Sequence, residues 1–451
     1  MVRLVMAVAW LALGASPAAA QIARERKNID DLTPQELAAY LHAIDVLKNR
    51  NDPTNNYSYH ANLHNLFVIS PPHGCEHGND LFFPWHRWHL VNFEKSLQAS
   101  DPDHPTLSTK NVTIPYWNWT KRASGKRYPN AFEDPKYPVL YNEFRNTAAS
   151  DPSYDEAYMT RIVRGNPDWN AFAGGPKSYG ALEIDSHNTM HSNYIGDLMA
   201  RPSTAAEDPI YWSFHAFIDM QWDRWQKIYK KPPTSQEKVL RGFRGSPKVT
   251  DTVDVTKLGY FYTHPPGSTD PPMRAAPPRL EARVLELPTA LAGVENLVAV
   301  WGGAGPFCFK LADPKEFHRA QLWLEGVRIP ATYSYTVEVF IHQSEKKYRR
   351  SDLAGAFCVW QGHWTVDGKP HEHTGNVFLD VTDRLRKEGV AKGEYVVTLV
   401  PSKVVPKARL KAVAPTMRPE VEEIQFRAVY VTLDGAPPPH TNLKAGGKHG
   451  H

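Results

Sequence analysis

The sequence is short of cysteine, of net charge and of long apolar runs, and each shortage excludes a class of protein. Three cysteines among 451 residues cannot build a disulfide-rich scaffold. The 52 basic and 48 acidic residues leave a net charge of +4, too small to indicate binding to nucleic acid or to an anionic membrane. No segment beyond the N-terminus has about 18 consecutive apolar residues, so we expect no membrane insertion of the mature chain.

The first twenty residues have the pattern of a secretory signal peptide. Arg3 supplies a positive start, the apolar run 4–13 is too short to span a bilayer, and three alanines at 18–20 offer a cleavage site. An uncleaved N-terminal anchor is the alternative. We therefore expect a secreted or periplasmic protein, in a compartment that permits disulfides.

What the sequence has in quantity is histidine (20), tryptophan (13) and proline (38), and their distribution divides the chain. The His- and Trp-rich part carries helical patterns, such as residues 33–47, where Thr33 can cap and Pro34 suits the first turn. A Pro-rich stretch follows, and then alternating runs predict strands at 336–342, 394–400 and 423–433. We expect a signal peptide, a helical domain, a linker, a β-rich domain and a flexible tail: residues 1–20, 21–264, 265–282, 283–434 and 435–451.

The later histidines are spaced for one face of a helix. His187 and His191 are four residues apart, so their side chains can hold one metal ion together. His215 follows in a helix predicted to begin at residues 208–209, and Asp219 lies four residues further, where it could support His215. A single pair at this spacing is more often a surface or core feature than a metal site.

The earlier histidines lie in an aromatic segment that should be buried. His77 and His86 are nine residues apart, and His64 lies upstream in a predicted helix. A buried neutral histidine needs partners for both ring nitrogens, which a metal ion can satisfy for several rings at once. Two sets of three imidazoles, without carboxylate or thiolate, suit copper or zinc.

Further segments join the histidines in one pattern: 81–87 (LFFPWHR), 111–119 (NVTIPYWNW), the His187/His191 pair and 208–219. Together these segments resemble tyrosinases and polyphenol oxidases, the type-3 dicopper proteins. Segments 257–262 and 354–357 resemble the tyrosine motif and the C-terminal domain of plant polyphenol oxidases.

The resemblance implies the fold, the cofactors and the ligands. The fold would be α+β and multidomain: a mainly α-helical type-3 copper domain with a four-helix bundle core, then an all-β sandwich-like C-terminal domain. The cofactors would be two copper ions in one binuclear site, with O2 as co-substrate. The implied copper ligands are His64, His77, His86, His187, His191 and His215. His60 and His73 are the alternatives to His64.

The resemblance also implies two catalytic residues. In the family a Glu and an Asn hold a water proposed as the base that deprotonates monophenols, and they match Glu183 and Asn188 on either side of His187. The alternative is that Glu183 is a solvated carboxylate at a helix start and Asn188 a cap.

The cysteines carry a further expectation. In fungal tyrosinases and mollusc hemocyanins a Cys-x-His at this place forms a thioether, so Cys75 is expected to be linked to His77. A free buried cysteine is the alternative. Cys308 and Cys358 are left as either a disulfide or two free thiols.

Two positions bear on the substrate pocket. Phe214 stands where many family members have a His before the last ligand, which would make the pocket more apolar. Arg201 could face the entrance and favour phenols that carry a carboxylate, although an exposed surface arginine is the alternative.

The sequence thus predicts a secreted copper phenol oxidase that acts on small phenols, oxidising o-diphenols to o-quinones and also hydroxylating monophenols. The alternatives are a catechol oxidase or o-aminophenol oxidase without monophenolase activity, a hemocyanin-like oxygen carrier and a zinc-binding structural domain. The β-rich domain resembles the lid of latent plant enzymes, and a permanent structural partner is the alternative to that role.

Overall fold

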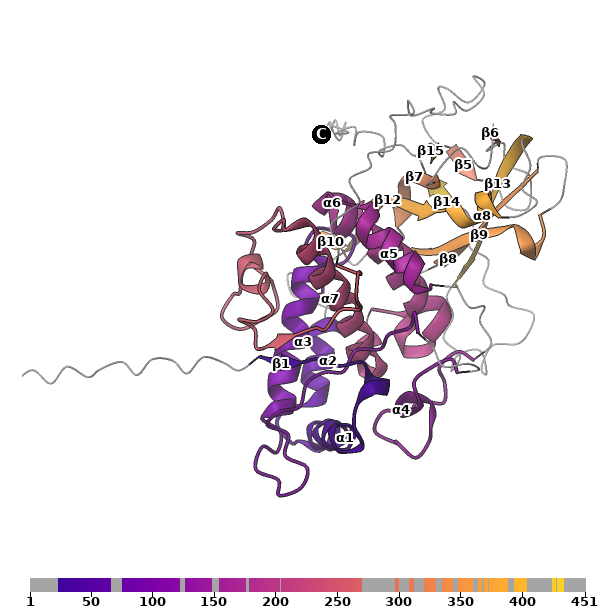
Figure 1. The fold of residues 1–451 in the computed structure, drawn as a ribbon. Helices are drawn as coiled ribbons and strands as arrows, with labels where there is room; N and C mark the ends of the chain where they lie inside the picture. Colours follow the sequence, from indigo (N-terminus) through magenta and orange to yellow (C-terminus); the bar gives the residue numbers. More distant parts are fainter. Residues whose placement is uncertain are drawn as a thin grey trace, which may run out of the picture.

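The computed structural model describes residues 23–65, 75–121, 126–147, 154–175, 178–202 and 204–269, followed by the strands and short connections between 297 and 433 (Figure 1). The predicted signal peptide, the linker beyond residue 269 and the predicted tail lie outside the described residues.

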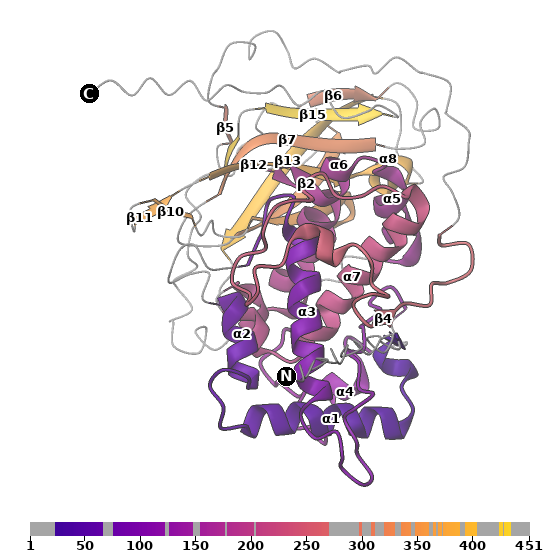
Figure 2. The same cartoon turned by 90° about the vertical axis from the view of Figure 1, so that its left-hand side faces the viewer.

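Helices make up the first part of the described chain, and strands make up most of the second. The helices are α1 (Pro34–Asn49), α2 (Tyr57–Asn65), α3 (Phe82–Gln98), α4 (Asn130–Glu133), α5 (Glu156–Gly165), α6 (Trp169–Ala173) and α7 (Ile210–Tyr229), with two π-helical segments, η3 (Glu183–His187) and η4 (Met190–Ile195). Figure 2 shows α3 and α7 side by side below the strands, with α1 across the far end.

The helix starts follow the local sequence, with one shift. Thr33 caps α1 as predicted: its hydroxyl accepts the Glu36 N–H, and the Glu36 carboxylate accepts the Thr33 N–H at 2.8 Å, which completes a capping box. Helix α7 begins at Ile210 rather than at the predicted residues 208–209. Asp208 still accepts the Ile210 N–H, but its carboxylate is mainly occupied by the buried Arg145 guanidinium.

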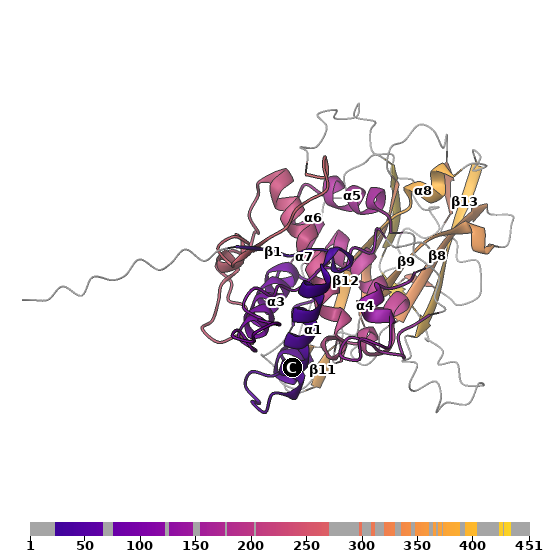
Figure 3. The same ribbon diagram turned by 60° about the horizontal axis from the view of Figure 1, so that its bottom comes forward.

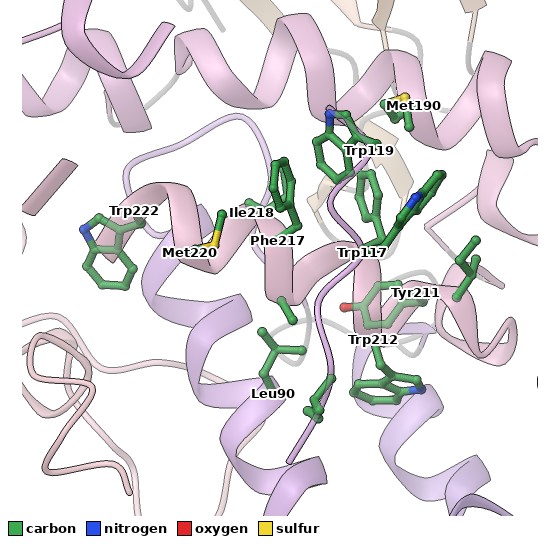
Figure 4. Close-up of a cluster of buried hydrophobic side chains, with 14 of the residues drawn as sticks. Leu90, Trp117, Trp119, Met190, Tyr211, Trp212, Phe217, Ile218, Met220 and Trp222 are labelled. Carbon is green, nitrogen blue, oxygen red and sulfur yellow. The ribbon is translucent and has the colours of Figure 1, made fainter. Parts of the chain in front are cut away.

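Aromatic side chains fill the space between these helices (Figure 4). Phe93 of α3 stacks on Trp212 of α7 with ring centroids 3.6 Å apart, and Trp119 stacks on Phe214 at 5.0 Å. Each buried aromatic ring removes a large apolar area from water, so these contacts hold α3 and the segment around Trp119 against α7.

The strands form two main antiparallel sheets. Sheet orders are β12-β7-β15 and β6-β13-β8-β9. The strands are β5 (Leu297–Ala299), β6 (Cys308–Leu311), β7 (Ala320–Ile329), β8 (Tyr335–Gln343), β9 (Leu353–Val359), β10 (Trp364–Val366), β11 (Lys369–His371), β12 (His373–Asp380), β13 (Gly393–Lys403), β14 (Ile424–Phe426) and β15 (Ala428–Leu433), with helix α8 (Thr382–Arg386) after β12. Inward side chains of both sheets share one hydrophobic cluster.

The predicted strands are found in the described residues. Strands β8 and β13 cover the predicted runs 336–342 and 394–400. The predicted run 423–433 contains β14, which pairs with β5, and β15, which joins the sheet of β7; residue 427 between them lies outside the described residues. A period of two fixes which residues face the core, but it does not fix which sheet a strand joins.

The two cysteines of the β-rich part lie on different strands. Cys308 lies on β6 and Cys358 on β9, with β13 and β8 between them. The side chains of both cysteines lie outside the described residues, so a disulfide and two free thiols both stay as predictions.

The strands pack directly on the helical segment that follows β3 (Ser178–Tyr179). Tyr179 and Ile184 belong to the same hydrophobic cluster as the β7, β8 and β12 side chains, and the Thr189 hydroxyl donates to the Ala356 carbonyl of β9 at 3.2 Å. Figure 3 shows β8, β9 and β13 standing beside the helices.

The short pairs β1 (Arg24–Glu25) with β4 (Tyr260–Phe261) and β2 (Gly174–Gly175) with β3 complete the described strands. Among the described helices, none has both the length and the apolar composition needed to cross a membrane.

Candidate metal centre

Two groups of side chains with metal-ligand chemistry lie buried where α2, α3, α7 and the π-helical segments meet. The ligand atoms of each group lie within 4.8 Å of one another: His64, Cys75, His77 and His86 in the first group, and His187, His191 and His215 in the second. All six predicted ligand histidines are thus placed together. His73, an alternative to His64, lies outside the described residues.

The two groups form one centre. The rings of His86 and His215 stack with centroids 4.4 Å apart and planes 2° from parallel. His77 and His187 lie 5.5 Å apart, and within the second group the Nε2 atoms of His191 and His215 are 3.2 Å apart. A pair of metal ions bound here would therefore be neighbours.

Five of the six rings use Nδ1 for an oxygen acceptor, which leaves the Nε2 lone pair for a metal. The acceptors are the carbonyls of Pro202, Phe82 and Met199 for His64, His86 and His191, the Glu183 carboxylate for His77 and the Asn188 side chain for His187. A partner at one ring nitrogen sets both the tautomer and the ring orientation.

Burial keeps these rings in the form that binds metals. Burial, together with repulsion from the neighbouring histidines, lowers the pKa well below the usual range for the five rings His77, His86, His187, His191 and His215. Metal ions bind neutral imidazole, so these unprotonated rings can bind a metal cation.

The helical stretch that carries His187 and His191 is mostly π-helical. The two residues lie in the segments η3 and η4. Their rings lie 4.5 Å apart, so the two histidines are paired on one helical face as predicted. Single π-helical turns are frequent at functional sites.

Cys75 lies within the first group beside the three imidazoles. It is fully buried, and burial raises the pKa of its thiol well above the usual range. Its Sγ lies 3.3 Å from His86 Nε2.

Glu183 and Asn188 each hold one of the candidate ligands. The Glu183 carboxylate accepts from His77 Nδ1 at 3.0 Å and from the Gly78 N–H at 2.8 Å, and Asn188 accepts from His187 Nδ1 at 2.8 Å. Both are buried, which rules out the solvated-carboxylate alternative for Glu183. Burial raises the pKa of Glu183 well above the usual range.

Asp219 was expected to support His215, and the structure corrects this. Its carboxylate accepts instead from Arg87 at 2.5 Å, from Arg26 at 3.2 Å and from the hydroxyls of Tyr260 and Tyr262. His215 Nδ1 has no hydrogen-bond partner among the described residues. Asp219 acts one step away, by joining α7 to the residue that follows His86 on α3.

Neighbouring histidines have other partners. His60 Nε2 bonds to the Ser96 hydroxyl at 2.9 Å, and it does not join the metal-binding group. His89, expected to pack or hydrogen-bond, has both nitrogens occupied, by the His60 carbonyl and the Tyr211 hydroxyl.

The two expected pocket residues differ in exposure. Phe214 is fully buried, and its ring lies 4.6 Å from that of His191. Arg201 is half-buried, and its carbonyl accepts the Ala205 N–H.

Sequence reasoning missed the segment 199–202. Its carbonyls at Met199 and Pro202 orient one histidine in each group. Backbone acceptors leave no signal in side-chain chemistry, so only the fold could reveal them.

The donor set fits copper. Six imidazoles, five of them with the tautomer fixed through Nδ1, in a buried centre without a carboxylate ligand, suit copper or zinc, and two adjacent sets of three suit a binuclear site.

Comparison with known proteins agrees with this geometry. A family model described as the common central domain of tyrosinase matches residues 39–156 and 140–228. A Hahella tyrosinase is 28% identical over 56% of this chain and 66% of its own length, and a Vicia faba polyphenol oxidase is 27% identical over 51% of this chain and 46% of its own. The chain thus spans about half to two thirds of these relatives.

The fold has solved counterparts. The structure of latent apple tyrosinase superposes with a TM-score of 0.57 at 18% identity, covering 92% of this chain and 98% of the other. At this identity the likeness concerns the fold, which here includes both the helical part and the strands.

Proposed function

Because the chain belongs to the tyrosinase and polyphenol oxidase family of type-3 copper proteins, we propose that it oxidises o-diphenols to o-quinones with O2 and also hydroxylates monophenols. The observation that carries the proposal is the convergence of two buried histidine triads in one centre. His64, His77 and His86 would hold one copper ion, and His187, His191 and His215 the other.

When bound, the copper pair would supply the redox chemistry with O2. The residues of the chain orient the ligand rings and exclude water from the centre. The carbonyls at 199–202 and Phe82 keep three ligand rings in position, so that each presents Nε2. Phe214 and Phe82 pack against the ligand rings and exclude water beside them. A preorganised, dry centre lowers the cost of reorganisation during the reaction.

Glu183 is the proposed base for monophenols. A fully buried carboxylate with a raised pKa is a better proton acceptor than an exposed one, and Asn188 accepts from the ligand His187. Since Glu183 also holds His77, its replacement by Gln keeps a hydrogen-bond acceptor for that ring while removing the base.

Oxygen uptake tests the function. Copper-loaded protein should consume O2 with catechol and also with tyramine. Glu183→Gln should slow tyramine hydroxylation much more than catechol oxidation, by roughly 100-fold, as expected for loss of a general base. Equal loss on both substrates would make Glu183 only a support for His77. Activity on catechol alone would indicate a catechol oxidase, and reversible O2 binding without turnover an oxygen carrier.

We also propose the thioether between Cys75 and His77. Its support is the burial of Cys75 inside the first triad. Formation removes one hydrogen from each partner, with O2 at the copper centre as the oxidant, so the linked peptide would be about 2 Da lighter. A Cys75 that is fully alkylated in active, denatured enzyme would contradict it.

The remaining expectations extend this proposal. The helices around the centre would form the four-helix bundle of the copper domain, and the two sheets a β sandwich. Residues 1–20 would direct export, and cleavage after Ala20 is checked by N-terminal sequencing of the mature protein.

A further inference from the structure

A second group of metal-binding side chains lies outside the copper centre. His42 of α1 faces the loop after α3, where His42 Nε2 and an Asp101 oxygen are 2.9 Å apart. The ring of His104 lies 4.6 Å from that of His42, and one ligand atom from each of the three residues falls within 4.8 Å of the others. Figure 2 shows α1 at the end of the helical part away from the strands.

The loop that carries two of these residues is held in place. Thr109, fully buried, accepts the Asp101 N–H at 2.9 Å and donates its own N–H to the Asp101 carbonyl at 3.0 Å. The Gln35 side chain of α1 donates to the Thr106 carbonyl. Pro102 and Pro105 also restrict the backbone between them. The three side chains are thus brought together by two elements that are already joined.

We propose that His42, Asp101 and His104 bind one divalent transition-metal ion, with zinc as the reference ion. Two imidazoles, one carboxylate and a water complete a tetrahedral zinc site. In such a site neighbouring ligand atoms lie about 3.3 Å apart, so the His42–Asp101 contact needs to open by only a few tenths of an ångström. The His42 side chain is 20% exposed and Asp101 37%, which leaves an entry path.

His104 sets a limit on the affinity. Its Nδ1 accepts the Leu107 N–H at 2.9 Å, so without metal its proton lies on Nε2. Binding through Nε2 moves that proton to Nδ1 and gives up the Leu107 contact. We therefore expect a weaker site than the buried copper centre, with the ion acting as a clamp between α1 and the loop.

The test uses copper-loaded protein dialysed against zinc sulfate, with both metals counted. The wild type and the control Asp103→Asn, an exposed carboxylate in the same loop, should gain one zinc per chain without losing copper. His42→Ala and Asp101→Asn should bind zinc at least tenfold more weakly. Zinc should raise the unfolding temperature of the wild type by a few degrees and leave that of His42→Ala unchanged.

Three outcomes would overturn the proposal: no zinc gained by the wild type, zinc gained only in exchange for copper, or equal zinc in the His42→Ala and wild-type proteins. A measurement on unmutated protein avoids any folding defect of the variants. Zinc should protect His42 and His104 from modification by diethyl pyrocarbonate, and unchanged modification of both residues would contradict the site.

Discussion

Each ligand histidine but one is held through its second ring nitrogen, and three of the five acceptors are backbone carbonyls. Their placement depends on how segments 199–202 and 82–86 fold rather than on which side chains they carry. The sequence therefore predicted the six imidazoles, whose chemistry is visible in residue type, but not the acceptors that orient them. It also placed Asp219 beside His215, whereas the charge of Arg87 draws the carboxylate to α3.

His60 is a buried histidine outside the metal-binding groups, and its burial affects the stability of the fold. Burial, with the nearby Arg50 charge, lowers the pKa of His60 to about 4, against about 6.5 when unfolded. The unfolded state therefore binds more protons between pH 6.5 and 4. As the pH is lowered through that window, the free energy of unfolding decreases by roughly 1.4 kcal/mol per pH unit at most. His60 contributes its full stability only above about pH 6.5.

Replacing His60 removes this contribution. His60→Gln cannot titrate, so its free energy of unfolding should fall less between pH 6.5 and 4 than that of the wild type, by about 3 kcal/mol over the whole window. Urea denaturation at several pH values measures the difference, and protonation of the copper ligands cancels because both proteins share it. Parallel pH curves for the two proteins would show that the His60 ring is protonated in the folded state.

At the scale of elements, a buried charge network joins α3 and α7 to the segment that follows β1. Arg26, just after β1, and Arg87 of α3 are both fully buried, and both donate to Asp219 of α7. Burial alone would lower the pKa of Arg87, but the charge and hydrogen bond of Asp219 together with the charges of Tyr260 and Asp223 outweigh it, and the pKa rises. Tyr260 of β4 lies with its ring 3.5 Å from the Arg26 guanidinium.

Removing the central carboxylate leaves two buried cations without their shared partner. Asp219→Asn should lower the free energy of unfolding by about 3–5 kcal/mol, because breaking a buried ion pair costs more than the pair contributes. It should also reduce copper retention, since α3 and α7 carry one ligand of each triad. The exposed control Asp254→Asn should change stability by less than about 0.5 kcal/mol. A decrease of less than 1 kcal/mol in the free energy of unfolding of Asp219→Asn would contradict a stabilising role of this buried charge network.

Element types were predictable where a local pattern decides them, and not where packing decides. The capping box at Thr33 and the alternation in 394–400 each fix their element locally. The π-helical form of η3 and η4 and the choice of partner strand for β14 and β15 involve neighbours that are distant in the sequence. Local periodicity carries no information on either point.

At the scale of the whole molecule, the strands lie on the segment that carries the second triad. β9 contacts η3, and Thr189, between His187 and His191, donates to the β9 carbonyl of Ala356. Displacing the β-rich part would therefore break a contact of the segment that carries His187 and His191. This contact supports the lid proposal, although a structural scaffold would use it as well.

Cleavage between the helical part and the β-rich part distinguishes a lid role of the β-rich part from a scaffold role. Limited proteolysis within 265–279 should raise turnover of small diphenols several-fold at unchanged copper content if the β-rich part covers the centre. Bulkier diphenols should gain more, because access limits them more strongly. Equal turnover per copper in nicked and intact protein, across several substrate sizes, would make the β-rich part a scaffold.

The most direct test of the central claim is the copper content of purified protein, measured together with catechol-dependent oxygen uptake. The wild type should hold two copper ions per chain and consume O2. His86→Ala and His215→Ala, one from each triad, should each hold fewer than two and lose turnover, while the exposed control Asp254→Asn should match the wild type in both. Two retained coppers and normal turnover in either triad variant would contradict the account.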